Sequence, residues 1–158
     1  MRNGKISEEV KNMTEDRGRR ITIDSNVIIA SVFSKRDAED STSKRVIIKC
    51  RTIDIPMITD IIVDECIGRA RRSKSKATAS EMKEELNNIS LDIIKLKPLP
   101  PIEELAERYK IRDKRDLQIL YSADKTESAI ILTQDKDFFE NVEGIKARIM
   151  SIYEYDEE

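Results

Sequence analysis

The chain has 158 residues, the size of one ordinary domain, and a formal net charge of −2. It contains no histidine, which excludes Ser-His-Asp and Cys-His catalysis and histidine-bearing zinc sites. Two cysteines are too few for a disulfide framework or a structural zinc, and no apolar run approaches the roughly 20 residues of a membrane span. Hydrolytic chemistry here must therefore use carboxylates, Lys, Ser, Thr, Tyr or a hard metal ion. We expect a cytoplasmic protein, because the N-terminus is polar and unlike a signal peptide.

The first half of the chain is predicted to alternate strands with helices. Residues 1–19 are polar, and we interpret them as an extension ahead of the domain. The β-branched alternation of residues 20–24 predicts a strand that ends at Asp24, and the apolar stretch 27–33 predicts a helix packed on it. The elements expected next are a helix from Ser41 or Ser43 to about Arg51, an extended segment over 53–58 and a helix capped by Thr59.

The second half continues the same alternation. Thr78 and Glu81 form a capping-box pair, which predicts a helix through Ile89. The elements expected after it are a strand over 91–96, helices over 101–109 and 113–124, a buried strand over 129–132, a helical turn over 137–140 and a strand over 147–152. Strands that alternate with helices predict an α/β fold with a mainly parallel sheet. We expect the domain to span residues 20–155, followed by an acidic tail over 156–158.

Acidic residues follow two of the predicted strands. Asp24 ends the first strand, and Asp135 follows the apolar strand that ends at Thr133. Ligands of open α/β sheets lie beyond the carboxyl ends of the strands. One strand-end Asp is most often an ordinary turn residue, but two at the same edge favour an acidic site.

Two other acids are candidate members of this site. Asp116 falls in the first turn of a predicted helix, where it also suits the helix dipole behind an N-cap at Asp113. Glu65 lies beside the apolar stripe of its helix and equally suits a solvated helix edge. Asp60 and Asp64 remain open as alternatives to Glu65.

Four segments, in order along the chain, resemble the PIN-domain family, which includes VapC-type toxins. They are Asp24 to Val27, Thr59 to Glu65, Arg112 to Leu120 and Ile131 to Phe138. The resemblance runs from Arg20 to about Tyr155, although residues 125–128 replace the Gly-Ala-Asp turn that family members often have before the fourth strand. It implies a three-layer α/β/α fold around a mainly parallel sheet.

The resemblance also implies the members of the site. The catalytic set would be Asp24, Glu65, Asp116 and Asp135, with Asp24, Asp116 and Asp135 as metal ligands and Asn26, Thr133, Asp137 and Asp113 in support. Converging carboxylates raise one another's pKa unless cations neutralise them, and oxygen ligands suit Mg²⁺ or Mn²⁺. The expected activity is therefore a metal-dependent endoribonuclease, one form of which is the toxin of a toxin–antitoxin pair. RNA, an antitoxin protein and a second copy of the chain are the expected partners.

Two other functions compete with this one. A phosphoacceptor receiver domain needs paired acids after its first strand, where this chain has Asp24 alone. A PIN-like module that binds RNA or protein without cleaving it stays open as the alternative.

A basic run over residues 67–76 contains five cations and no acid. Its members are Arg69, Arg71, Arg72, Lys74 and Lys76. The run is expected to hold the RNA backbone, and a solvated loop is the competing interpretation. Most of the aromatic residues Phe33, Tyr121, Phe138 and Phe139 are expected in the core, so that recognition would depend on phosphates more than on stacked bases.

Overall fold

The sheet of the computed structural model, which describes residues 18–33, 38–73 and 76–158, is parallel throughout. Its strand order is β3-β2-β1-β4-β5. The strands are β1 (Arg20–Ile23), β2 (Ile55–Thr59), β3 (Ile93–Ile94), β4 (Ile130–Thr133) and β5 (Arg148–Ser151). The chain thus places the first strand at the centre and directly beside the fourth.

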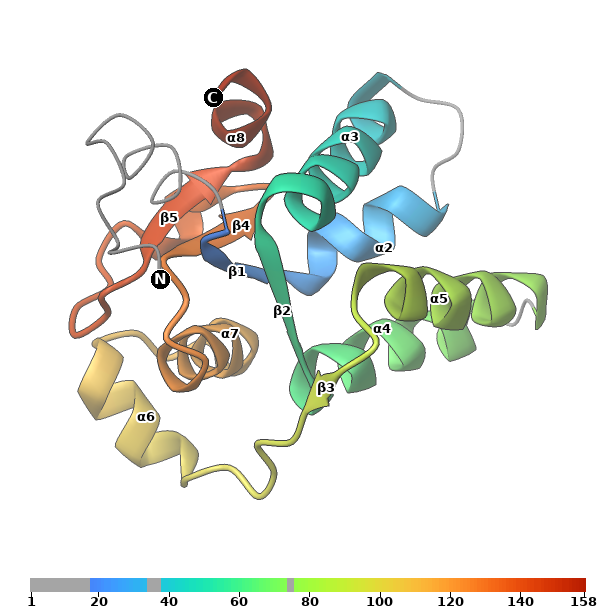
Figure 1. Ribbon diagram of the computed structural model, residues 1–158. Coiled ribbons are helices and arrows are strands. Elements are labelled where there is room, and N and C mark those ends of the chain that lie inside the picture. The colour runs from blue at the N-terminus through green and yellow to red at the C-terminus, as the bar shows by residue number, and fades with distance from the viewer. Residues whose placement is uncertain (1–17, 34–37, 74–75) are drawn as a thin grey trace, which may run out of the picture.

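Helices cover both faces of this sheet. They are α2 (Ser25–Phe33), α3 (Ala38–Ile53), α4 (Asp60–Arg72), α5 (Lys76–Ile89), α6 (Ile102–Tyr109), α7 (Lys114–Lys125), the 3₁₀ helix η1 (Lys136–Phe139) and α8 (Ile152–Glu157). Figure 1 shows α2, α3 and α8 on one side of the sheet and α6 and α7 on the other, with α4 and α5 packed together at one end. The predicted three-layer α/β/α fold is confirmed. Across the described ranges no helix is both long and apolar enough to cross a bilayer.

The burial of the two central strands explains their sequences. All four residues of β4 are buried, and in β1 only Arg20 is exposed. A strand covered on both faces needs a continuous apolar run instead of alternation, which is what residues 130–132 provide. The core between the layers is built mainly from Ile, Leu and Val, with Tyr109 and Tyr155 as its largest fully buried side chains.

Several element boundaries differ from those predicted. The helix α2 begins at Ser25, directly after Asp24, and α5 begins at Lys76, two residues before the predicted cap at Thr78. The predicted strand over 147–152 stops at Ser151, where the helix α8 starts and takes in part of the expected acidic tail. Its signal was a capping box, in which Ser151 Oγ accepts from the Glu154 N–H (3.1 Å) and Glu154 Oε1 accepts from the Ser151 N–H (3.2 Å).

A buried carboxylate ties α8 to the start of β1. Asp54 accepts from the backbone N–H of Arg19 (3.0 Å), from its guanidinium (3.3 Å) and from the hydroxyl of Tyr155 (2.6 Å). Its side chain is fully buried, whereas the Arg19 side chain is 19% exposed. Because Asp54 lies in the bend between α3 and β2 and its partners precede β1 or belong to α8, it holds three segments together.

We expect Asp54→Ala to lower the free energy of unfolding by about 2–4 kcal/mol, because it removes the acceptor of the Tyr155 hydroxyl and of the Arg19 backbone N–H and leaves the Arg19 guanidinium with Glu158 alone. Urea denaturation checks this. The exposed Asp92→Ala is the matched control and should change stability by less than about 0.5 kcal/mol. Equal stability of the two variants would contradict a structural role for Asp54.

Candidate active site

Asp24 lies where β1 and β4 end side by side. Its backbone N–H donates to the Leu132 carbonyl (2.8 Å), which continues the pairing of the strands by one residue. Its carboxylate is only 8% exposed and accepts from Thr133 Oγ1 (3.0 Å) and from Ser25 Oγ (3.4 Å). The helix α2 leaves immediately, so the carboxylate is fixed between a strand end and a helix start.

Asn26 bridges the same two strand ends. Its Nδ2 donates to Thr133 Oγ1 (3.4 Å), and its Oδ1 accepts from the Gln134 N–H (3.4 Å). Thr133 therefore accepts from Asn26 while it donates to Asp24. The supporting positions predicted for Asn26 and Thr133 correspond to this network.

Glu65 reaches the site from α4. Thr59 caps this helix by accepting from the Ile62 N–H, and its hydroxyl is 3.0 Å from that of Ser122 in α7. These contacts place the start of α4 against α7. Glu65 is half-buried and is 3.8 Å from the exposed guanidinium of Arg115.

The two alternatives to Glu65 point elsewhere. Asp60 accepts from the backbone N–H groups of Leu96 (3.1 Å) and Lys97 (3.2 Å), so it anchors the segment after β3. Asp64 is exposed and pairs with the ammonium group of Lys97.

The start of α7 contributes two more acids. Asp113 is its N-cap and accepts from the Asp116 N–H (3.0 Å). Asp116 lies in the first turn and is half-buried. The interpretation of Asp113 as a cap and the interpretation of Asp116 as a pocket acid are therefore compatible.

One pocket of about 260 Å³ collects these acids. It is lined by Asp24, Ser25, Asn26, Glu65, Asp113, Arg115, Asp116, Ile119, Phe138 and Phe139. Four of the lining residues are carboxylates from three separate elements or their caps, and Arg115 is the single cation among them.

Two of the pocket acids, Asp24 and Asp116, have a raised pKa. Burial raises the pKa of Asp24 to about 6 and the charge of Glu65 adds to this, although hydrogen bonds from Thr133, Asn26 and Ser25 oppose it. Burial also raises the pKa of Asp116 to about 6, assisted by the charges of Asp113, Asp24 and Glu65. Asp24, Glu65 and Asp116 are thus close enough to act on one another.

These side chains do not form a finished metal site. Among the described residues, no three acidic or cysteine side chains are grouped so that they hold a metal ion as they stand. The donor set nevertheless fits a hard divalent cation, because all donors are oxygens and their mutual repulsion is relieved by positive charge. Asp24, Glu65 and Asp116 are the residues that would hold it.

Asp135 and Asp137 are not among the residues that line this pocket. Asp135 is exposed and its Oδ1 accepts from the Asp137 N–H (3.0 Å), which makes it the N-cap of η1. The predicted role of Asp135 as a metal ligand stays a prediction.

A basic hollow of about 330 Å³ adjoins the acidic pocket and shares Ser25, Asn26, Glu65 and Arg115 with it. Arg69 and Arg72 of the predicted basic run line this hollow, and Arg69 lies over the Phe33 ring at 5.9 Å. Arg71 lies in a different groove. Lys74 lies outside the described residues, and of Lys76 the structure describes the backbone alone.

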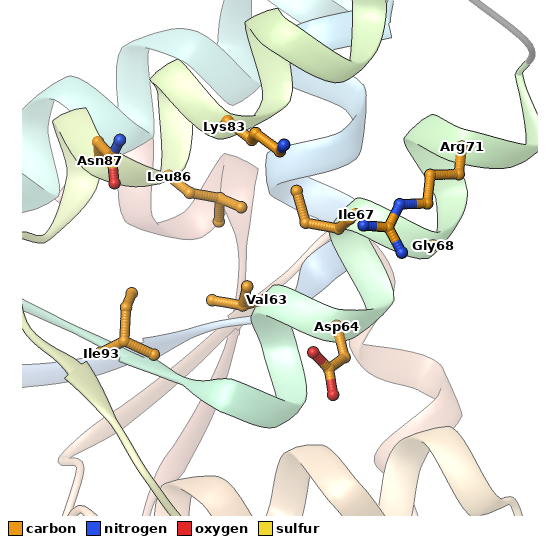
Figure 2. A pocket seen from close by; sticks show the side chains of 9 residues that line it. All are labelled: Val63, Asp64, Ile67, Gly68, Arg71, Lys83, Leu86, Asn87 and Ile93. Carbon is orange, nitrogen blue, oxygen red and sulfur yellow. The ribbon is translucent and has the colours of Figure 1, made fainter.

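A larger groove, about 660 Å³, lies between α4, α5 and β3 (Figure 2). Val63, Ile67, Leu86 and Ile93 form an apolar floor, and Asp64, Arg71 and Lys83 stand at its rim. Its one carboxylate is paired with Lys97. The groove therefore has the character of a contact surface and lacks the acids that metal chemistry needs.

Fold and pocket together define an α/β protein with carboxylates gathered at the carboxyl edge of a parallel sheet. The family model of the PIN domain matches residues 21–145, and the chain belongs to the PIN domain family. This confirms the resemblance seen in the sequence. PIN domains are generally nucleases, and they typically use divalent metal ions.

Among solved structures, the chain is similar to one from VapBC2 of Rickettsia felis, determined bound to a DNA fragment from their promoter. The TM-score is 0.56 and the identity 14%, over 83% of this chain and 98% of the other. At this identity the likeness concerns the fold. Comparison with curated proteins gives no match.

The raised pKa of Asp24 makes the metal-free protein less stable as pH rises. The folded state binds more protons than the unfolded chain between about pH 4 and 6, so the free energy of unfolding falls through this window. We expect Asp24→Asn to raise stability at pH 7 by up to about 3 kcal/mol and to flatten this dependence. Urea denaturation with chelator at pH 5 and pH 7 checks this, with Asp92→Asn as control. A wild-type pH profile in Asp24→Asn would contradict it.

Proposed function

We propose that this PIN domain is a metal-dependent endoribonuclease that cleaves RNA phosphodiesters at the acidic pocket. The observation that carries the proposal is that one pocket collects the carboxylates of Asp24, Glu65 and Asp116 from separate parts of the chain. Stability alone gives no reason to keep three like charges together. A site that binds cations does.

Each residue at the pocket has its own proposed role. The ion, Mg²⁺ or Mn²⁺, would be held by Asp24, which accepts a hydrogen bond from Thr133, and by Asp116 and Glu65 from two helices. When bound, such an ion supplies a water of lowered pKa for in-line attack on phosphorus and charge for the leaving oxygen. Asn26 keeps Thr133 oriented toward Asp24. Asp135 is the further proposed ligand, and its Oδ1 also caps η1 beside the pocket.

The basic hollow is the proposed binding site of the RNA backbone. Arg69, Arg72 and Arg115 line it, and it opens into the acidic pocket through the residues that the two share. Phosphates held by these guanidinium groups would place the next phosphate of the strand over the acids.

Cleavage of single-stranded RNA in Mn²⁺ is the direct test. We expect chelator to abolish it and Asp24→Asn and Asp116→Asn each to lower the rate at least about 100-fold, since each removes a ligand charge. Asp135→Asn should also lower the rate, whereas Asp92→Asn, which removes an exposed acid outside the pocket, should retain it. Cleavage that survives chelation would contradict the mechanism. RNA binding without any cleavage would favour the non-cleaving module instead.

The hollow can be tested through the salt dependence of binding. We expect Arg72→Gln and Arg115→Gln each to weaken RNA binding severalfold and to lower the slope of log K against log salt by about 0.7 for each phosphate that is no longer neutralised. Arg148→Gln removes an equally exposed guanidinium outside the hollow and should leave the slope unchanged. Equal slopes for all three variants would place the RNA elsewhere.

An antitoxin protein and a second copy of the chain are the proposed protein partners. The antitoxin follows from the likeness to VapBC2, which is a toxin–antitoxin pair. For the homodimer, the groove in Figure 2 is the proposed contact. A two-fold contact sets one surface against itself, and this rim carries both an acid, Asp64, and the bases Arg71 and Lys83.

Light scattering after size-exclusion chromatography tests the homodimer. We expect a dimer for the wild-type protein and a monomer for Ile93→Lys, because a charge enters the apolar floor. Ile48→Lys, on α3, places the same charge at a similarly exposed isoleucine and should stay dimeric. A monomeric wild-type protein would rule the contact out.

A further inference from the structure

Phe138 is a large apolar residue that lies at the surface. Its side chain is 68% exposed, whereas the adjacent Phe139 is 5% exposed. Both line the acidic pocket. The sequence favoured the core for most of the aromatic residues, and for Phe138 that expectation is wrong.

The segment that carries Phe138 is firmly held. Asp135 caps η1, the Glu140 N–H donates to the Asp137 carbonyl (3.3 Å), and the Val142 N–H donates to the Phe139 carbonyl (3.2 Å). Phe139 inserts into the core below. The exposed ring therefore stands on a fixed turn, so that little conformational entropy is lost when something packs on it.

The pocket thus combines two kinds of wall. Asp24, Glu65 and Asp116 provide carboxylates, and Phe138, Phe139 and Ile119 provide apolar surface. A ligand that suits both walls carries a group for the cation site and, next to it, a flat uncharged ring. A nucleotide within a single strand has this form, with a phosphate on one side of its sugar and a base on the other.

We propose that Phe138 stacks on the nucleobase adjacent to the phosphodiester that is cleaved. The inference rests on the proposed nuclease function and adds a base contact to it. RNA is favoured over an apolar protein segment as the occupant because the adjoining hollow offers Arg69, Arg72 and Arg115 to successive phosphates. Every base has a π-face, so this contact selects single strands over duplexes and not one sequence.

Binding of a fluorescent single-stranded RNA 12-mer, with chelator present so that nothing is cleaved, tests the contact. We expect Phe138→Ala to weaken binding about tenfold, Phe138→Tyr to retain it, and Phe138→Leu to behave like Ala. Tyr153→Ala removes a ring that is 49% exposed on α8 and is the control without effect. In a series of oligomers that each lack one base, the oligomer that lacks the base contacted by Phe138 should bind wild type and Phe138→Ala with equal affinity.

Three results would overturn the stacking contact. The first is equal RNA affinity of Phe138→Ala and wild type. The second is full retention of affinity in Phe138→Leu, which would indicate an apolar surface for protein contacts. The third is a wild-type protein that binds no RNA. A failure of the nuclease proposal alone would give a different result. In that case the ring dependence of binding persists, while wild-type protein with Mn²⁺ cleaves no RNA.

Discussion

The hydrogen bond from Thr133 to Asp24 joins residues 109 positions apart and is the contact on which the site depends. It exists because β1 and β4 are parallel neighbours that end at the same edge. Asp24 is also held by its backbone bond to Leu132 and by the hydroxyl of Ser25, where α2 begins. Around this pair, Asn26 closes the strand ends, while α4 and α7 bring Glu65 and Asp116 to the same pocket.

The protein retains unfavourable charge at this edge and compensates elsewhere. Asp24 and Asp116 are held where burial and their neighbours oppose ionisation. Asp54 is also buried, but Arg19 and Tyr155 donate hydrogen bonds to its carboxylate. One buried carboxylate serves the fold and the other serves the pocket. Their partners, and not their burial, distinguish them.

Much of this arrangement was predictable from sequence. The apolar run before Thr133 predicted a buried parallel strand, and the order of acids indicated the PIN family. The identity of the second acid was not predictable in the same way. Successive helical residues are rotated by about 100°, so Asp64 and Glu65 face different directions, and only the packing of Thr59 against Ser122 decides which one meets Asp24.

Asp135 and Phe138 illustrate what sequence patterns leave open. Asp135 follows β4 as predicted, and its Oδ1 caps η1, a contact that the sequence pattern does not show. Likewise, two adjacent phenylalanines in a 3₁₀ turn cannot both face inward, and composition does not say which one does. Such choices depend on turn geometry over two or three residues, where hydrophobic periodicity carries no information.

The central position of β1 also has a consequence for folding order. The strand that is synthesised first among the described residues finds its partner β4 only after more than a hundred residues have followed, as the separation of 109 between Asp24 and Thr133 shows. Contacts of such high sequence separation form late and slowly, because the intervening loop must close first. The acidic pocket is therefore among the last features to assemble. A nascent chain that has not yet reached Thr133 has the carboxylate of Asp24 but no pocket around it.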